Sequence, residues 1–129
     1  MEGPSSPVPR IYVVDDDESA RTGLVRLLRS AGFQVEAFAS AQEFLDRTQD
    51  DREALLVLDV RMPGIGGLEL QKRLAAKSSK LPIIFLTAFE DPRARSEALN
   101  SGAIAFLQKP VDEQTLLEAI KVAYQRKAI

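Results

Sequence analysis

Polar side chains that could handle a metal ion and a phosphoryl group stand shortly after apolar runs of the chain. Those that share this position are Asp15, Asp16, Asp17, Asp59, Thr87 and Lys109. If the apolar runs are strands of a parallel α/β sheet, their carboxyl ends meet at one edge, where such sheets bind ligands. Neighbouring carboxylates repel one another unless a cation neutralises them, and Mg²⁺ prefers oxygen ligands that it can share with phosphates. The carboxylates, together with the hydroxyl of Thr87 and the ammonium of Lys109, predict a site for a hard cation and a phosphoryl group.

Five strands are predicted to carry these residues to that edge. The runs that indicate them cover residues 10–14, 33–38, 54–59, 82–87 and 104–107. The third run is the most apolar and should be central. A helical pattern follows each strand, and right-handed crossovers then predict a flavodoxin-like, doubly wound α/β fold. Its parallel sheet would have five strands in the order 2-1-3-4-5, with Asp15 and Asp16 beside Asp59 at the switch point.

Local signals place the ends of the five helices. Asp17 stands at the start of the first helix, because a carboxylate favours the positive end of the helix dipole. Ser40 and Glu43 form a capping box that opens the second helix. Asp91 followed by Pro92 is typical of an N-cap and a first helical residue in the fourth. The other two helices are predicted over residues 67–76 and from 112 to about 126.

The chain is predicted to hold one domain. Residues 1–9 are rich in Pro and Ser and should form a flexible tail, residues 10–126 form the domain, and residues 127–129 are the C-terminal end. A chain of 129 residues is long enough to bury one hydrophobic core.

Composition excludes several kinds of site. The chain has no Cys and no His, which excludes disulfides, thiolate metal sites and an imidazole as base, ligand or phosphoryl carrier. Its net charge of −2 gives no reason to expect bulk attraction to nucleic acid. No apolar run approaches the ~18 residues that a membrane span needs, and the N-terminus lacks the pattern of a signal peptide. These absences predict a cytoplasmic domain that contacts neither membrane nor nucleic acid.

Four segments together identify a family. They are residues 13–16 (Val-Val-Asp-Asp), 58–64 (Leu-Asp-Val-Arg-Met-Pro-Gly), 85–88 (Phe-Leu-Thr-Ala) and 106–110 (Phe-Leu-Gln-Lys-Pro). In this order and spacing, the chain resembles the receiver domain of two-component response regulators from Arg10 to about Tyr124. Residues 40–45 (Ser-Ala-Gln-Glu-Phe-Leu) are similar to receivers of the nitrogen-fixation and nitrate type, which usually precede a helix-turn-helix output domain.

The resemblance implies that Asp59 is the phosphoacceptor, whose carboxylate attacks the phosphohistidine of a sensor histidine kinase. It implies a Mg²⁺ ion bound directly by Asp16 and Asp59, mostly through water by Asp15, and by the backbone carbonyl of Arg61. The kinase would contact the first helix near residues 19–23. The domain would then be no ordinary enzyme, although it would catalyse its own phosphoryl transfer and a slow autodephosphorylation.

The same resemblance implies a switch. Lys109 would pair with Asp59 at rest and with a phosphoryl oxygen afterwards, and Thr87 would donate its hydroxyl to the phosphoryl group. Phe106 matches an aromatic residue that swings inward as Thr87 moves, with an ordinary core Phe as the alternative. The peptide bond before Pro110 is expected to be cis, with a trans proline that ends the strand as the alternative.

Three positions vary within the family pattern. Arg61 and Phe89 lie two residues beyond Asp59 and Thr87, where family members tune the access of the hydrolytic water. We expect the bulky Phe89 to shield the acyl phosphate and slow its loss. Gly66-Gly67 replaces the commoner Asp-Gly or Ser-Gly and predicts only a looser start of the third helix.

Three other functions fit parts of the sequence. Residues 64–67 look like a Gly-rich dinucleotide loop, but the third fingerprint position is Glu69 and the loop does not directly join a strand to a helix. Asp15 and Asp17 resemble the nucleophile motif of haloacid-dehalogenase phosphohydrolases, which also need acids after the fourth strand, where residues 87–90 read Thr-Ala-Phe-Glu. A pseudo-receiver, an interaction module with an inactive site, is disfavoured by the intact set of site residues.

The output surface is expected on the fourth helix, fifth strand and fifth helix. It offers charges of both signs from Arg93, Arg95, Glu97, Asp112, Glu113 and Lys121. Mixed charge suits a symmetric contact and predicts phosphorylation-enhanced homodimerisation, with a merely solvated surface as the alternative. A stand-alone receiver and a fragment of a DNA-binding transcription regulator are both open. The family resemblance favours the fragment, whose linker would begin near residues 127–129.

Overall fold

A computed structural model describes residues 10–47 and 54–127 of the chain. They form five strands and five helices in alternation. The strands are β1 (Arg10–Val14), β2 (Gln34–Phe38), β3 (Ala54–Asp59), β4 (Ile83–Thr87) and β5 (Ala105–Gln108). The helices are α1 (Glu18–Ser30), α2 (Ala41–Asp46), α3 (Gly67–Ala76), α4 (Pro92–Asn100) and α5 (Glu113–Lys127). The tail predicted over residues 1–9 and the last two residues of the C-terminal end lie outside the described part.

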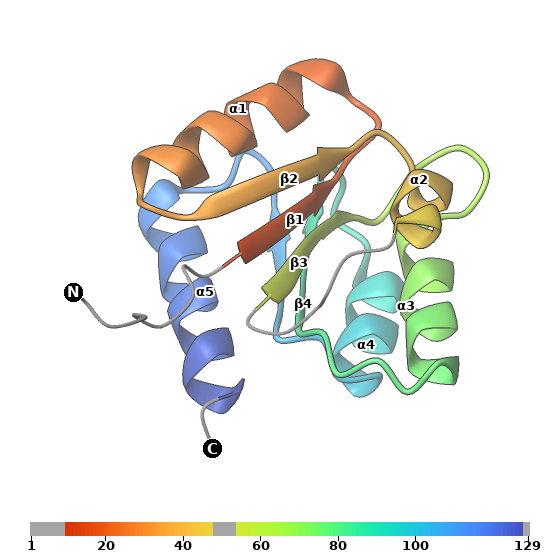
Figure 1. Cartoon of the computed structure of the whole chain (residues 1–129). Helices are drawn as coiled ribbons and strands as arrows, with labels where there is room; N and C mark the ends of the chain where they lie inside the picture. Colours follow the sequence, from red (N-terminus) through yellow and green to blue (C-terminus); the bar gives the residue numbers. More distant parts are fainter. Residues whose placement is uncertain (1–9, 48–53, 128–129) are drawn as a thin grey trace.

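All neighbouring strands run parallel, in the order β2-β1-β3-β4-β5 (Figure 1). The chain moves from β1 to β2 on one side and then returns to β3 on the other side of β1. The carboxyl ends of β1 and β3 therefore flank the switch point, where ligands of doubly wound sheets bind. The predicted flavodoxin-like fold and its strand order are confirmed.

Helices cover both faces of the sheet, with α1 and α5 on one face and α2, α3 and α4 on the other (Figure 1). Alternate residues of a strand belong to the two resulting cores. In β1, Ile11 and Val13 pack with the α1 and α5 layer, whereas Tyr12 and Val14 pack with the opposite layer. Because neither face meets water, the central strand β3 has no polar side and is apolar up to its last residue.

The two helices of the first layer bury apolar residues at helical spacing. In the described part of α5, Leu116, Ile120 and Ala123 recur at helical spacing and are buried. In α1, Leu24 and Leu28 are buried, but Ala31, which continues the same helical spacing, is exposed. The reason is that α1 ends at Ser30, so Ala31 is already the C-cap and leaves the helical face.

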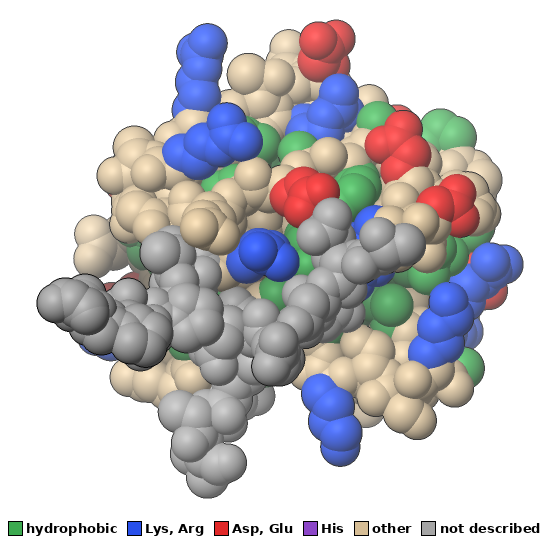
Figure 2. All heavy atoms as spheres, in the orientation of Figure 1, with side chains coloured by type: hydrophobic (Ala, Val, Ile, Leu, Met, Phe, Trp, Pro, Cys, Tyr) green, Lys and Arg blue, Asp and Glu red, His purple; other side chains and the backbone are tan. Residues whose placement is uncertain are grey.

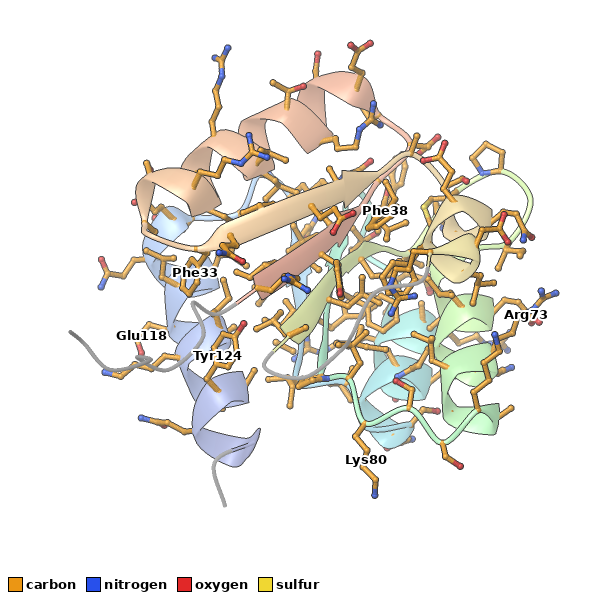
Figure 3. The ribbon with its side chains drawn as sticks, viewed as in Figure 1. Phe33, Phe38, Arg73, Lys80, Glu118 and Tyr124 are labelled. Carbon is orange, nitrogen blue, oxygen red and sulfur yellow. The ribbon has the colours of Figure 1, made fainter. Side chains whose placement is uncertain are left out.

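Tyr124 of α5 packs against the residue that precedes β2 and binds the first residue of β1 (Figure 3). The rings of Phe33 and Tyr124 stack with their centroids 6.5 Å apart. The Tyr124 hydroxyl donates a hydrogen bond of 2.9 Å to the backbone carbonyl of Arg10. These contacts join the C-terminal helix to the first residue of the sheet.

Aspartate side chains cap the first turns of α1 and α4. Asp17 accepts hydrogen bonds from the backbone N–H groups of Ser19 and Ala20, at 2.9 and 3.2 Å, which confirms its predicted place at the start of α1. Asp91 accepts from the N–H of Ala94 at 3.1 Å, and a proline follows it in the first turn of α4, as predicted. These caps satisfy backbone donors that a helix cannot pair internally.

The capping box of α2 is shifted by one residue from its usual form. Ser40 accepts from the backbone N–H of Glu43 at 3.1 Å, as predicted. The Glu43 carboxylate, however, accepts from the backbone N–H of Ala39 at 3.0 Å, one residue before the N-cap.

The start of α3 lies directly on the end of β3. Gly66 is the N-cap and makes no side-chain cap, whereas the looser start of this helix stays a prediction. Gly67 has a stricter role, because a Cβ atom there would lie 2.4 Å from the backbone oxygen of Asp59 and 3.1 Å from the ring of Phe85. Only glycine lets the helix approach the strand end so closely.

The surface carries charges of both signs. Acidic and basic side chains both lie on the face seen in Figure 2, together with exposed apolar atoms. Among residues 10–47 and 54–127, no helix combines the length and the apolar character needed to cross a bilayer.

Candidate functional site at the carboxyl edge of the sheet

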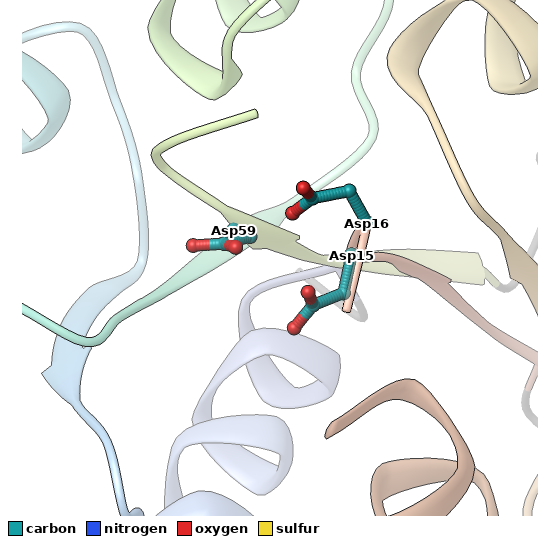
Figure 4. A group of neighbouring side chains, drawn as sticks. All are labelled: Asp15, Asp16 and Asp59. Atoms are coloured by element: carbon teal, nitrogen blue, oxygen red, sulfur yellow. The ribbon is translucent and has the colours of Figure 1, made fainter. Parts of the chain in front are cut away.

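Three carboxylates meet where β1 and β3 end (Figure 4). Asp15 and Asp16 follow β1, and Asp59 is the last residue of β3, whose register places Val14 opposite Leu58. One oxygen of each carboxylate lies within 4.8 Å of the others. Asp15 is buried, Asp59 is partly buried and Asp16 is exposed. The cluster is open to solvent on one side and could hold a hard cation that keeps some of its waters.

Lys109 lies against two of these carboxylates. Its Nζ atom is 2.7 Å from Oδ2 of Asp15 and 3.7 Å from Oδ2 of Asp59. The prediction that Lys109 pairs with Asp59 at rest is therefore only partly right, because the hydrogen bond goes to Asp15. The physical reason is burial: the Asp15 side chain is 2% exposed and the Asp59 side chain 11%. A charge without a partner costs more free energy the more deeply it is buried, so Asp15 needs the ammonium more than Asp59 does.

The second oxygen of Asp15 is also occupied. Oδ1 of Asp15 accepts a hydrogen bond of 2.9 Å from the backbone N–H of Asp17. Arg21 adds a contact that the sequence did not predict, since its Nη1 atom donates to the backbone carbonyl of Asp15 at 2.8 Å. No spacing signal distinguishes Arg21 from an ordinary helical Arg. The acidic loop after β1 is thus held by Arg21 of α1 and by Lys109, which follows β5.

Burial dominates the electrostatics of Asp59. Its pKa is raised from 3.8 to about 6, mainly because burial disfavours the charged form. The nearby charges of Asp15 and Asp16 raise the pKa further, whereas Lys109 and a backbone hydrogen bond from Arg61 lower it. For Lys109, burial alone would lower the pKa, but the hydrogen bond to Asp15 and the charge of Asp59 outweigh it, so the pKa is raised. A further cation would relieve the repulsion among the carboxylates.

Thr87 ends β4 and is buried beside the site. Its hydroxyl donates to the backbone carbonyl of Phe89 at 3.1 Å and accepts from the N–H of Phe89 at 3.3 Å. Its own carbonyl accepts a hydrogen bond of 2.7 Å from the backbone N–H of Lys109. Thr87 therefore connects the β4–α4 loop, through Phe89, to Lys109 at the end of β5.

Phe106 is buried in this structure, at 8% exposure. Its ring packs on Phe85 with centroids 5.9 Å apart, and its backbone carbonyl accepts from Nη1 of Arg95 at 3.0 Å. Phe106 and Thr87 line the same cavity of about 300 Å³, together with residues of the α4 start. The two side chains are therefore neighbours across the gap between the end of β4, β5 and the start of α4.

The remaining predicted positions also lie at this edge. The Lys109–Pro110 bond is cis, which selects the first of the two predicted alternatives. The Arg61 guanidinium lies over the ring of Phe89, with Cζ 5.2 Å from the centroid. Phe89 is 59% exposed, so its ring covers no core. The Arg61 side chain also reaches Asp91 at 3.5 Å, and Asp91 was predicted only as a helix cap.

Known proteins are similar to this chain in sequence and in fold. The family model described as response regulator receiver domain matches residues 11–121. Nodulation protein W of Bradyrhizobium diazoefficiens is 45% identical over 116 residues, which make up 90% of this chain and 51% of that protein. Transcriptional regulatory protein FixJ of the same species is 43% identical over 116 residues, 90% of this chain and 57% of that protein. This chain spans about half the length of the curated relatives that it matches.

Solved structures agree with the sequence comparison. The response regulator StyR has 48% identity and a TM-score of 0.85, over 95% of this chain and 64% of that chain. The FixJ-N crystal structure has 34% identity and a TM-score of 0.82, over 91% of this chain and 93% of that chain. The chain therefore belongs to the response regulator receiver domain family.

Proposed function

We propose that this chain is a phosphorylation-activated switch, in which Asp59 accepts a phosphoryl group from a sensor histidine kinase. The observation that carries the proposal is the meeting of Asp59 with two further carboxylates and with Lys109 at the switch point of the sheet. A carboxylate can attack phosphorus and form an acyl phosphate. The ammonium within ion-pair distance can neutralise the charge that arrives. The exposed side of α1, near residues 19–23, would receive the kinase.

Mg²⁺ fits the carboxylate cluster, since each member can offer one oxygen at mutual distances within 4.8 Å. Asp16 and Asp59 would bind the ion directly, with the backbone carbonyl of Arg61. Asp15 would contribute through water, because both of its oxygens already accept hydrogen bonds, from Asp17 and Lys109. When bound, Mg²⁺ would stabilise the negative charge on the phosphoryl oxygens during transfer.

After transfer, the side chains around Asp59 would exchange partners. Lys109 would shift from the carboxylates towards a phosphoryl oxygen, a change for which a flexible point charge is suited. The Thr87 hydroxyl would leave the carbonyl of Phe89 and donate to the phosphoryl group. Phe106 shares the cavity with Thr87 and would follow it. Since the Phe106 ring is already buried, we propose a shift within the cavity and no swing from solvent.

We propose that the output surface, formed by α4, β5 and α5, carries this change to a longer protein. Arg95 of α4 is hydrogen-bonded to the backbone of Phe106, so the α4 surface is connected to the switch. Several of the relatives are named transcriptional regulatory proteins, and this chain spans about half of their length. We therefore propose a DNA-binding regulator. The exposed charges of both signs on α4 and α5 support a dimer that forms on phosphorylation. Sedimentation with and without beryllofluoride tests the dimer, and an unchanged mass would contradict it.

Phe89 is proposed to protect the acyl phosphate from water. Its ring is exposed and lies under the Arg61 guanidinium, on the loop that follows Thr87. Replacing Phe89 with Ala should therefore speed the loss of phosphate. An unchanged rate of dephosphorylation would show that the ring does not shield the site.

Phosphorylation by acetyl phosphate and Mg²⁺, followed by intact-mass measurement, tests the main proposal. The wild-type chain should gain one phosphoryl group, and Asp59→Asn should gain none. Equal labelling of the two proteins, or no labelling of the wild type, would refute the assignment of Asp59. Repeated turnover of a phosphate ester would instead support the alternative, a metal-dependent phosphohydrolase.

A further inference from the structure

Arg61 connects the phosphoacceptor with the start of α4. It stands two residues after Asp59, and its backbone lies beside that carboxylate and favours its charged form. Its guanidinium lies 3.5 Å from Oδ2 of Asp91 and lies over the ring of Phe89 at a distance suited to a cation–π contact. One residue therefore contacts the nucleophile through its main chain and the β4–α4 loop through its side chain.

Asp91 has a different partner for each of its oxygens. Oδ1 accepts from the backbone N–H of Ala94 and caps α4, whereas Oδ2 faces Nη2 of Arg61. The two contacts can be separated by substitution, because Asn supplies a capping oxygen about as well as Asp but carries no charge. A change in Asp91→Asn can then be traced to the ion pair.

The ion pair is weak enough to be exchanged. The Arg61 side chain is 60% exposed and that of Asp91 29%, and exposed pairs of this kind contribute little to stability. A phosphoryl group on Asp59 would place roughly two negative charges near the residue that holds this guanidinium. Guanidinium groups bind phosphoryl oxygens through paired hydrogen bonds, which are stronger than a long contact with a single carboxylate oxygen.

We propose that Asp91 is a positioning residue that holds the Arg61 guanidinium at the rim of the site, in competition with the phosphoryl group on Asp59. The inference rests on the proposed function of Asp59. Before transfer, the guanidinium is bound to the residue that caps α4. After transfer, it is divided between that cap and the phosphoryl group, so that charge on Asp59 changes the contacts at the first turn of α4. By linkage, Asp91 lowers the affinity of the site for the phosphoryl group.

Beryllofluoride titration in the presence of Mg²⁺, followed by calorimetry, tests this competition. Asp91→Asn should bind beryllofluoride about two- to fivefold more tightly than the wild type, the factor expected for an exposed ion pair. Arg61→Gln should bind more weakly, and adding Asp91→Asn to it should change nothing further. The gain in Asp91→Asn should disappear at ~1 M salt, where exposed charges are screened.

Asp112→Asn is the matched control. Asp112 accepts from the backbone N–H of Thr115 at 3.0 Å at the start of α5, and the described residues place no cation against it. The substitution removes the same charge from a helix cap at the same edge of the sheet, and the affinity should not change.

Three outcomes would overturn the inference. They are an equal gain in Asp112→Asn, an Asp91→Asn variant that binds like the wild type, and a gain that persists in the Arg61→Gln background. If the wild type itself bound no beryllofluoride, the proposed function would fail and this inference with it.

Discussion

The Nζ atom of Lys109 lies 2.7 Å from Oδ2 of Asp15 and 3.7 Å from Oδ2 of Asp59. The ammonium therefore stands between a buried carboxylate that it must compensate and the carboxylate proposed as nucleophile. A phosphoryl group on Asp59 would meet the cation after a small displacement. The same arrangement makes Lys109 important for stability as well as for transfer, because Asp15 has little contact with water.

Lys109→Met should lower the free energy of unfolding by roughly 1–3 kcal/mol, because it leaves the buried charge of Asp15 without its cation. Urea unfolding without metal measures the change. Lys72→Met is the control, since Lys72 is 62% exposed and pairs with Glu97 at 3.2 Å on the surface. That variant should lose less than about 0.5 kcal/mol. Equal losses in the two variants would show that Asp15 does not depend on Lys109.

Asp59→Asn should stabilise the metal-free protein at alkaline pH. The pKa of Asp59 is about 6 in the folded protein against 3.8 for the free group, so the folded state holds the proton more tightly. The charged carboxylate therefore costs stability above pH 6, and this cost declines as the pH falls from 6 towards 3.8. With allowance for partial solvent exposure, the gain at high pH should be on the order of 1 kcal/mol.

Thermal unfolding with a chelator at pH ~8 and ~4 measures this gain, which should be present at the first pH and nearly absent at the second. Asp112→Asn removes an equal charge at an exposed helix cap and should give no such difference. A variant at Asp59 that is less stable than the wild type at the higher pH would contradict the raised pKa.

The elements that build the site could be predicted because burial leaves few alternatives. β1 and β3 cover residues 10–14 and 54–59, as predicted, since an apolar run bounded by polar residues is the pattern of a strand buried on both faces. Once the strand order is set, Asp15 and Asp59 must be neighbours, because adjacent parallel strands end together. The prediction of the carboxylate cluster required no knowledge of side-chain contacts.

The pairing of side chains within the site depended on burial that the sequence does not display. Lys109 was within reach of two carboxylates, and the exposure of each decided which one it bonds. The contacts of Arg21 with Asp15 and of Arg61 with Asp91 join residues whose types and spacing are ordinary for exposed helices and loops. Such contacts follow from how loops pack after the sheet has formed.

Gly67→Ala should destabilise the protein by roughly 1–3 kcal/mol, the usual effect of forcing an extra methyl group into a packed site. The new Cβ would lie 2.4 Å from the backbone oxygen of Asp59, so α3 and the end of β3 must move apart. Gly23→Ala is the matched control, because it also lies inside a helix and a Cβ there meets nothing within 4 Å. That variant should gain up to about 1 kcal/mol from helix propensity. A Gly67→Ala variant as stable as the wild type in urea unfolding would contradict the close approach.

Mg²⁺ should raise the melting temperature of the wild type, and Asp16→Asn should lose most of this gain. A ligand at ~100 times its dissociation constant stabilises the folded state by about 2.7 kcal/mol, and the loss of one direct ligand weakens binding and with it the gain. Asp17→Asn is a control from the same acidic run, since Asp17 caps α1 and lies outside the cluster of three carboxylates. Asn can replace it as a cap, so the response to Mg²⁺ should persist. If Asp17→Asn lost the response and Asp16→Asn kept it, the ion would bind to the helix start and not between β1 and β3.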